Sequence, residues 1–192
     1  MSELMPYLRG EQTGKVVGIT FDDGYRNNLT EALPILKEFG FSATCYIISQ
    51  KIGGVNEWDL EKGIPENPLM DEDDIHQWID GGMEIGSHTQ NHVHLTECDT
   101  QQAEMEITQS KQDLEQLFGS TIDHFCYPWG KHTTNIAQLT KQTKYQSATT
   151  TKRGRATQAH SLQHLPRVPV SHSTLPHLFL LKVLTAYEDR RG

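Results

Sequence analysis

Apolar and polar residues along the chain form two kinds of segment in turn. Short runs rich in β-branched and aromatic residues predict strands, and longer segments with apolar residues three or four apart predict amphipathic helices. Gly, Pro, Asn and Asp residues separate the segments and indicate turns. Strands are predicted at residues 16–21, 42–49, 83–88, 121–128, 145–151 and 164–170.

Helices are predicted between these strands. The clearest covers 99–118, because Ala103, Ile107 and Leu114 lie on one apolar face and Gly119 follows as a C-terminal cap. The remaining helices are expected at 27–39, 71–81, 135–143 and from Ser173 or Thr174 onward. Pro34 lies inside the first of them, which predicts either a start near Glu31 or a kink.

Strands that alternate with helices at this spacing predict a parallel α/β sheet or barrel. We expect a single domain over residues 1–192, with a C-terminal helix at 173–190 packed on it or at a dimer face. An amphipathic membrane contact is the alternative for that helix. The polar segment 50–70 is long for a loop and is therefore expected to be functional or disordered. In it, Trp58 either stacks on a ligand or anchors the loop.

Composition excludes several classes of protein. The 192 residues carry a net charge of −8, which argues against nonspecific nucleic-acid binding. Three cysteines without a CxxC pair indicate neither a disulfide scaffold nor a zinc ribbon. The sequence has no apolar run long enough for a transmembrane helix, and residues 1–14 do not resemble a secretion signal. We therefore expect a cytoplasmic protein, with a homo-oligomer left open.

Two adjacent acids, Asp22 and Asp23, follow the first predicted strand. Like charges repel, so these carboxylates either lie in water at a turn or a cation holds one of them. After the third predicted strand, His88 and His92 are four residues apart, either as surface histidines or as two ligands of one ion. If both pairs meet at the same edge, two imidazoles and one carboxylate would bind zinc with a position left for water. The other Asp could then take the proton of that water.

Three motifs carry a family resemblance. TFDDGY at 20–25, SHTQNH at 87–92 and YPWG at 127–130 resemble the NodB-type polysaccharide deacetylases, carbohydrate esterase family 4. The resemblance runs from about residue 16 to about residue 170. It implies a distorted (β/α) barrel with fewer than eight repeats and a divalent metal, usually zinc. It also implies hydrolysis of an acetyl group, most often N-acetyl, from a sugar polymer.

The resemblance also implies a role for each motif residue. Asp22 corresponds to the catalytic base of the family. The metal ligands correspond to Asp23, His88 and His92. The groove motif that contacts substrate corresponds to Tyr127, Pro128, Trp129 and Gly130. In the family, the backbone N–H at the aromatic residue helps to hold the oxyanion, and its ring forms a wall of the groove.

The chain departs from the family pattern at two places. Many members have an arginine before the Pro-aromatic-Gly motif that clamps the base, and here Cys126 stands there. Arg167 is the expected replacement and should pair with Asp22, because a charge in an apolar strand needs a partner. Pairing with a surface glutamate is the alternative.

The second departure concerns the catalytic acid, since the usual C-terminal L-x-H strand is absent. His172, after the sixth predicted strand, is the best candidate by position, and the others are His132, His160 and His164. A partner subunit could also supply the acid, or turnover could proceed weakly without one.

The sequence therefore predicts a metal-dependent hydrolase that removes acetyl groups from an amino-sugar polysaccharide or its precursor. An O-acetyl esterase on xylan-type glycans and an amidohydrolase on small amides are the alternatives among enzymes. A noncatalytic glycan-binding relative is the alternative outside them.

Overall fold

The computed structural model describes residues 1–60 and 62–191, and its six strands form one parallel sheet. Neighbours in the sheet follow chain order from β1 to β6, as expected for successive strand–helix units. The strands are β1 (Ile19–Phe21), β2 (Ala43–Ile47), β3 (Glu84–Ser87), β4 (His124–Cys126), β5 (Ser147–Arg153) and β6 (Leu165–Arg167).

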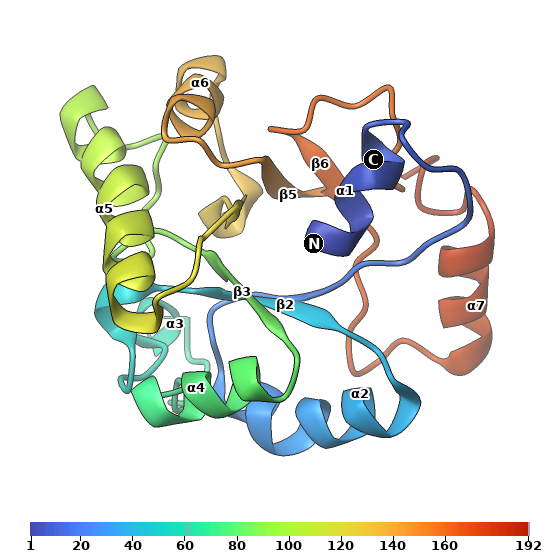
Figure 1. Ribbon diagram of the computed structural model, residues 1–192, viewed down its shortest axis with the longest axis horizontal. Helices are drawn as coiled ribbons and strands as arrows, with labels where there is room; N and C mark the ends of the chain where they lie inside the picture. Colours follow the sequence, from blue (N-terminus) through green and yellow to red (C-terminus); the bar gives the residue numbers. More distant parts are fainter. Residues whose placement is uncertain (61, 192) are drawn as a thin grey trace.

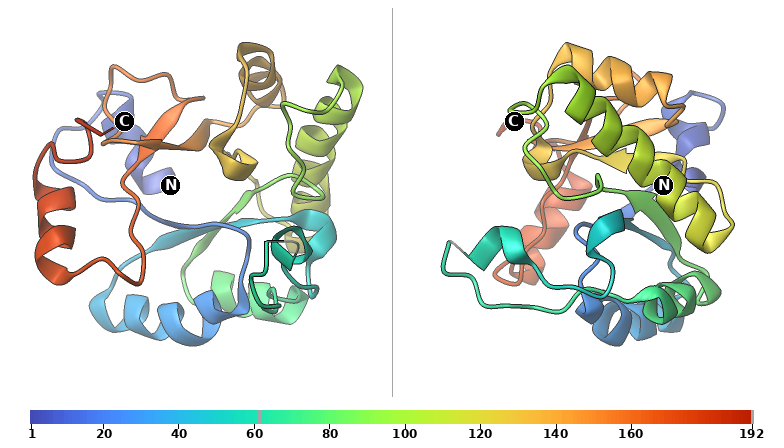
Figure 2. Two further views of the ribbon diagram at one scale, coloured as in Figure 1. Left: turned by 180° about the vertical axis from the view of Figure 1, so that it is seen from behind. Right: turned by 90° about the vertical axis from the view of Figure 1, so that its left-hand side faces the viewer.

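The sheet curls into an open barrel with helices outside it (Figure 1), and the side view shows the same curl (Figure 2). Every residue of β2 is buried, which is typical of a parallel strand covered on both faces. Strands β1 and β6 are the two ends of the sheet, so the barrel is open between them. The predicted distorted barrel with fewer than eight repeats is confirmed.

Most helices lie between successive strands, as the sequence pattern predicts, while one precedes β1 and one follows β6. The α-helices are α1 (Met5–Leu8), α2 (Leu33–Phe39), α3 (Glu57–Leu60), α4 (Glu72–Asp80), α5 (Thr100–Phe118), α6 (Thr134–Gln142) and α7 (Pro176–Leu184). Shorter turns are η1 (Ser2–Leu4), η2 (Asn28–Ala32), η3 (Ser49–Lys51) and η4 (Pro128–Gly130). The Asp99 side chain caps α5 at its start, and Gly119 ends it at a φ of 64°. No helix in the described residues is long and apolar enough to cross a membrane.

Several boundaries differ from the predictions. Strand β1 begins at Ile19 rather than Val16, and Val17 is 67% exposed because the chain has not yet entered the sheet there. A π-helical turn, η2, precedes α2, which places Pro34 in the first turn of α2, where its missing N–H costs nothing. Helix α7 begins after Leu175, without a side-chain cap from Ser173 or Thr174.

The polar segment 50–70 has short-range structure in its described residues, 50–60 and 62–70. It contains helix α3, and isolated bridges join Tyr25 to Leu69 and Val55 to Pro68. The first of these bridges ties the segment to the turn that follows β1. The segment therefore lies at the carboxyl end of the sheet, where parallel α/β folds place their sites.

Candidate active site

The turn after β1 separates the two adjacent carboxylates. Asp23 has a φ of 71° and Gly24 a φ of 77°, so two successive residues are left-handed. A left-handed residue other than glycine is uncommon, although Asp tolerates this conformation better than most. The turn sends Asp23 toward the end of β3 and leaves Asp22 facing β6, as the contacts of each show.

Asp23 meets the two histidines that follow β3. Its Oδ1 lies 3.2 Å from Nε2 of His88 and 3.2 Å from Nε2 of His92. Both histidines are buried, and their ring centroids are 5.0 Å apart. The predicted convergence of one carboxylate and two imidazoles at this edge of the sheet is therefore present.

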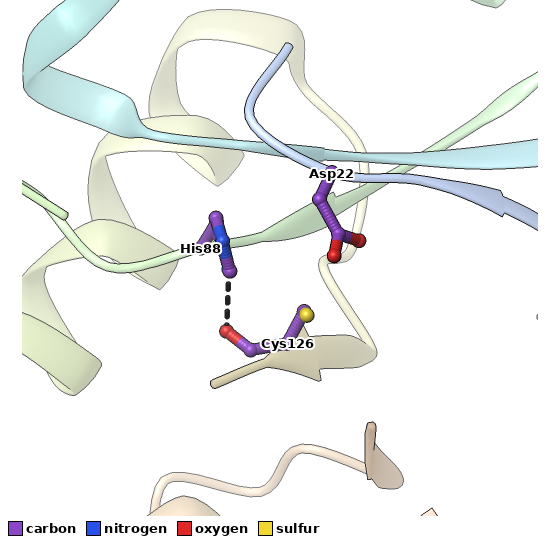
Figure 3. A group of neighbouring side chains, drawn as sticks. All are labelled: Asp22, His88 and Cys126. Carbon is purple, nitrogen blue, oxygen red and sulfur yellow. Dashed lines mark hydrogen bonds between the residues drawn. The ribbon is translucent and has the colours of Figure 1, made fainter. Parts of the chain in front are cut away.

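The donor set fits a divalent cation. Nδ1 of His88 donates to the Cys126 carbonyl at 2.6 Å (Figure 3), which fixes the ring with Nε2 directed toward Asp23. Metal-binding histidines commonly have such an outer hydrogen bond, which fixes the tautomer. Two nitrogens and one carboxylate oxygen match the ligands of zinc sites that keep an open position.

His92 is held in a different way from His88. Its Nδ1 is buried and has no hydrogen-bond partner among the described residues. The rings of Trp58 and Trp129 instead lie with their centroids 4.3 Å from the centroid of His92. Packing between two indoles, rather than an outer hydrogen bond, therefore orients this second imidazole.

The protonation states suit a cation as well. Burial alone would raise the pKa of Asp23, but hydrogen bonds from His88 and His92 hold it well below its usual value. Burial lowers the pKa of His92, so this imidazole is neutral near pH 7. Burial lowers the pKa of His88, but Cys126 and Asp23 outweigh it and raise that pKa well above its usual value. Asp23 and His92 are thus in the state that binds a metal, and a bound metal would displace the proton that His88 shares with Asp23.

Asp22 pairs with a positively charged side chain, the guanidinium of Arg167. Arg167 donates from Nη1 to Oδ1 and from Nη2 to Oδ2 of Asp22, both at 2.7 Å. Its Nε donates to the Thr150 carbonyl at 2.9 Å, which fixes the plane of the guanidinium. The pair joins β6 to the end of β1 across the open side of the barrel. The predicted contact between Arg167 and Asp22 is confirmed.

Arg167 also determines the charge of Asp22. Burial would raise the pKa of Asp22, but the charge and hydrogen bonds of Arg167 outweigh it and lower the pKa below its usual value. The side chain of Asp22 remains 31% exposed. Asp22 is thus an ionised carboxylate that a water molecule can reach.

Cys126 lies beside this pair without forming a second metal site. Asp22, His88 and Cys126 have ligand atoms close together, and Figure 3 shows the three side chains. However, Nη2 of Arg167 is 3.3 Å from Sγ of Cys126, and its guanidinium already bonds both oxygens of Asp22. A second cation there would meet the guanidinium charge, so we exclude this set as a metal site.

The groove motif makes a strained turn after β4. Trp129 has a φ of 53°, and a Cβ on Gly130 would lie 2.1 Å from Oγ1 of Thr151. Glycine is therefore required at position 130. Trp129 is half-buried, and its ring stacks on His94 at 3.6 Å between centroids. The ring thus forms one wall beside the metal ligands.

The prediction that Tyr127 and Pro128 contact substrate is wrong for the Tyr127 side chain. Tyr127 is fully buried, its ring packs on Phe125, and its hydroxyl donates to the Gln163 carbonyl at 3.1 Å. Successive residues of an extended chain point to opposite faces, so Cys126 faces the site and Tyr127 faces away. Pro128 is also buried, and both residues support the turn rather than line the groove.

The candidates for the catalytic acid are spread apart. His172 is exposed in a turn after β6 and has no hydrogen bond or ion pair in the described part of the chain. His132 and His164 contact each other, with 2.6 Å between Nε2 and Nδ1, and His132 stacks on Tyr127. His160 bonds to Thr157. The role of His172 stays a prediction.

Loop residues around helix α3 were only partly anticipated from the sequence. Asp59 accepts from Lys62 at 2.8 Å and from the Tyr25 hydroxyl at 3.4 Å. Nζ of Lys62 also lies 5.4 Å from the centroid of the Trp129 ring. No periodic signal marks Lys62, because the path of an irregular loop decides where its residues meet the site.

The chain is similar to known proteins in sequence and in fold. Residues 9–148 match the family model described as polysaccharide deacetylase. YxkH of Bacillus subtilis (strain 168), named as an inferred polysaccharide deacetylase, is 31% identical over 157 residues, 82% of this chain and 52% of that protein. A peptidoglycan-N-acetylglucosamine deacetylase of Bacillus cereus (strain ATCC 14579) is 25% identical over 134 residues, 69% of this chain and 55% of that protein.

Among solved structures, the Streptococcus pyogenes deacetylase PplD in complex with acetate matches with a TM-score of 0.81 and 25% identity. The match covers 95% of this chain and 77% of PplD. The chain spans about half the length of the two curated relatives it matches.

Proposed function

Because the chain belongs to the polysaccharide deacetylase family, we propose that it is a metal-dependent hydrolase that removes acetyl groups, N-acetyl above all, from an amino-sugar polysaccharide or its precursor. One observation carries the proposal. Two adjacent carboxylates have different partners: Asp23 meets two imidazole nitrogens, and Asp22 meets a guanidinium. This arrangement supplies a cation site and, beside it, an ionised base.

The metal site consists of Asp23, His88 and His92. A divalent ion held there, zinc being the best match to these ligands, would polarise the acetyl carbonyl and activate a water molecule. The Cys126 carbonyl keeps Nε2 of His88 directed into the site. Trp58 and Trp129 keep His92 in place and shield it from bulk water.

Asp22 acts as the general base. It accepts a proton from water as the water oxygen bonds to the acetyl carbonyl carbon. Arg167 holds Asp22 ionised and fixes both of its oxygens, so the base does not rotate away from the water. The backbone N–H of Trp129 donates to the carbonyl oxygen as charge develops there, an interaction worth about 3–4 kcal/mol in other acyl-transfer sites.

The C–N bond then breaks, and the leaving nitrogen takes a proton. His172 is proposed as the donor, because it follows β6 at the same end of the sheet as Asp22. The products are acetate and a free amino sugar. A His172→Gln variant that keeps the melting temperature and zinc content of the parent but loses turnover would support this role, whereas unchanged turnover would remove it.

Acetate release tests the proposed function directly. The zinc-loaded protein and its chelator-treated form would be incubated with chitin oligomers and, separately, with acetylxylan. We expect zinc-dependent release from the chitin oligomers. Release from acetylxylan alone would make the protein an O-acetyl esterase, and ring opening of small cyclic amides, without acetate release from either glycan, would make it an amidohydrolase. No release from any substrate by zinc-replete protein would indicate a noncatalytic glycan-binding relative.

A further inference from the structure

Helix α7 turns its charged residue inward and its leucines outward. Lys182 is 6% exposed, whereas Leu180 is 54% and Leu184 66% exposed. A surface helix of a globular protein normally has the reverse arrangement, with leucine against the core and lysine in water. These leucines therefore do not pack on the barrel, and the expected dimer face or membrane contact for this helix stays a prediction.

Buried ion pairs hold α7 in this orientation. Nζ of Lys182 donates to the Pro169 carbonyl at 2.5 Å and lies 3.2 Å from Oε1 of Glu188. Glu188 is fully buried and also accepts from Nε of Arg153 at 2.7 Å. Turning the helix to bury its leucines would take Lys182 away from a buried carboxylate, which is strongly unfavourable. The leucines are thus fixed on the outside.

The chain segment that carries this face is basic, although Arg167 binds Asp22 and Arg153 and Arg155 pair with Glu188 and Asp189. Residues 152–191 contain seven Lys and Arg and two Asp and Glu, a net charge of +5, whereas residues 1–151 carry −13. Arg190 and Arg191 are exposed, and with Leu181 they line a hollow of about 430 Å³ after the C-terminal end of α7. Figure 1 shows α7 on the opposite side of the molecule from α5.

We propose that the leucine face of α7, defined as Leu180, Leu181 and Leu184, docks on an anionic lipid surface together with Arg190 and Arg191. The leucines enter the boundary between headgroups and acyl chains, and the arginines meet the lipid phosphates. A second copy of the chain is a poorer partner. A two-fold interface uses the same patch of both copies, so it would bring the arginines of both copies into one interface without adding an unpaired carboxylate, since Asp189 is already paired with Arg155.

The test is co-sedimentation of the full chain with vesicles of phosphatidylcholine alone or mixed with phosphatidylglycerol. We expect binding to the mixed vesicles that weakens as salt is added, and little binding to phosphatidylcholine alone. The double change Leu180→Asp with Leu184→Asp should lower partitioning at least about tenfold. The double change Arg190→Gln with Arg191→Gln should lower it about 25-fold, if each charge contributes as in other basic segments.

Matched control variants test whether a loss of vesicle binding is specific to the leucine face of α7. Met105 and Leu117 are 54% and 42% exposed on α5, so Met105→Asp with Leu117→Asp should leave binding unchanged. Lys37→Gln with Lys141→Gln serves as the charge control. Melting temperature and acetate release from a soluble oligomer should stay at parental values in all variants, so the result does not depend on the proposed catalytic function.

Three outcomes would overturn the proposal. One is an absence of binding to the mixed vesicles by the parent protein. Another is an equal loss of binding in the α5 controls. The third is a dimer in light scattering that the leucine changes dissociate, which would assign the face to a second copy of the chain.

Discussion

At the carboxyl end of the sheet, the neighbouring carboxylates of Asp22 and Asp23 have partners of different kinds. On the β3 side, Asp23 faces the Nε2 atoms of His88 and His92, two nitrogens that can bind a metal ion. On the β6 side, Asp22 faces a guanidinium that is bonded to both of its oxygens. The left-handed turn at Asp23 and Gly24 is what directs the two carboxylates apart.

This difference explains why two like charges can be adjacent. Asp23 lies among imidazoles that can bind a metal ion with it, whereas Arg167 balances the charge of Asp22 and leaves this carboxylate able to exchange a proton with water. We therefore propose metal binding for Asp23 and proton transfer for Asp22. Substitutions on one side should therefore change metal affinity, and substitutions on the other should change turnover.

The largest expected effect on turnover comes from removing the base. Asp22→Asn keeps the shape and can still accept hydrogen bonds from Arg167, but the amide cannot take a proton. Turnover should fall by about 10²–10⁴, as is typical for loss of a general base. Steady-state acetate release measures this. Turnover within threefold of the parent would show that the β6 side does not carry the base.

Loss of the guanidinium should have the next largest effect. Arg167→Met keeps bulk but removes the charge, so turnover at neutral pH should fall by roughly 10², the cost of misplacing a catalytic group. Arg167→Lys is the matched control, since it keeps the charge and loses the two-pronged contact. Zinc content should be unchanged in both, and a loss of zinc in Arg167→Met would contradict the separation of tasks.

The pH dependence of turnover should also change in Arg167→Met. Arg167 lowers the pKa of Asp22 against the effect of burial. Without Arg167, burial dominates and the pKa of Asp22 rises, so the base is protonated at higher pH. The acid limb of the pH–rate profile should therefore shift to higher pH in Arg167→Met, and turnover should recover in part as pH increases. If the acid limb of the pH–rate profile does not shift in Arg167→Met, the titration of Asp22 does not produce that limb.

On the β3 side, the indole packed on His92 gives a smaller, separable effect. His92 has no outer hydrogen bond in the described residues, so Trp58 is its main support together with Trp129. Trp58→Ala should weaken zinc binding about tenfold, comparable to loss of an outer-shell partner. Trp58→Phe keeps an aromatic ring and should lose much less zinc affinity. Competition with a fluorescent chelator measures the zinc affinity of both variants. Zinc affinities equal to that of the parent would contradict the role of Trp58 in supporting His92.

The smallest expected effect is at Cys126. Its thiol touches Arg167 at 3.3 Å but is not needed for charge or for metal binding. Cys126→Ser retains a small polar group there, so turnover and zinc affinity should change less than about threefold, as expected for one near-neutral contact. A loss of zinc in this variant would indicate that the thiol is a ligand after all.

Much of the fold could be predicted from the sequence, because the six strands have β-rich apolar runs and most of the helices have clear apolar periodicity. The site at Asp22, Asp23, His88 and His92 could be predicted from motifs at strand ends. The Arg167 contact followed from a charge placed in an apolar strand. Tyr127 was misassigned although its side chain alternates with that of Cys126, so strand periodicity could have corrected it.

Other features depend on tertiary structure that local patterns do not contain. Lys62 reaches Trp129 only because the loop around α3 folds over the mouth. The run LFLLKVL at 178–184 is apolar enough to predict leucines against the core. Its orientation is instead determined by Glu188, which lies outside the helix and takes Lys182 into the interior.

The division of tasks between the two carboxylates is tested most directly by zinc binding to Asp22→Asn and Asp23→Asn, measured by isothermal titration calorimetry on metal-free protein. We expect Asp22→Asn to bind zinc within a few-fold of the parent. Asp23→Asn, which loses an anionic ligand, should bind at least about 100-fold more weakly. Equal losses in the two variants, or a greater loss in Asp22→Asn, would contradict the assignment of Asp23 to the metal and Asp22 to the proton.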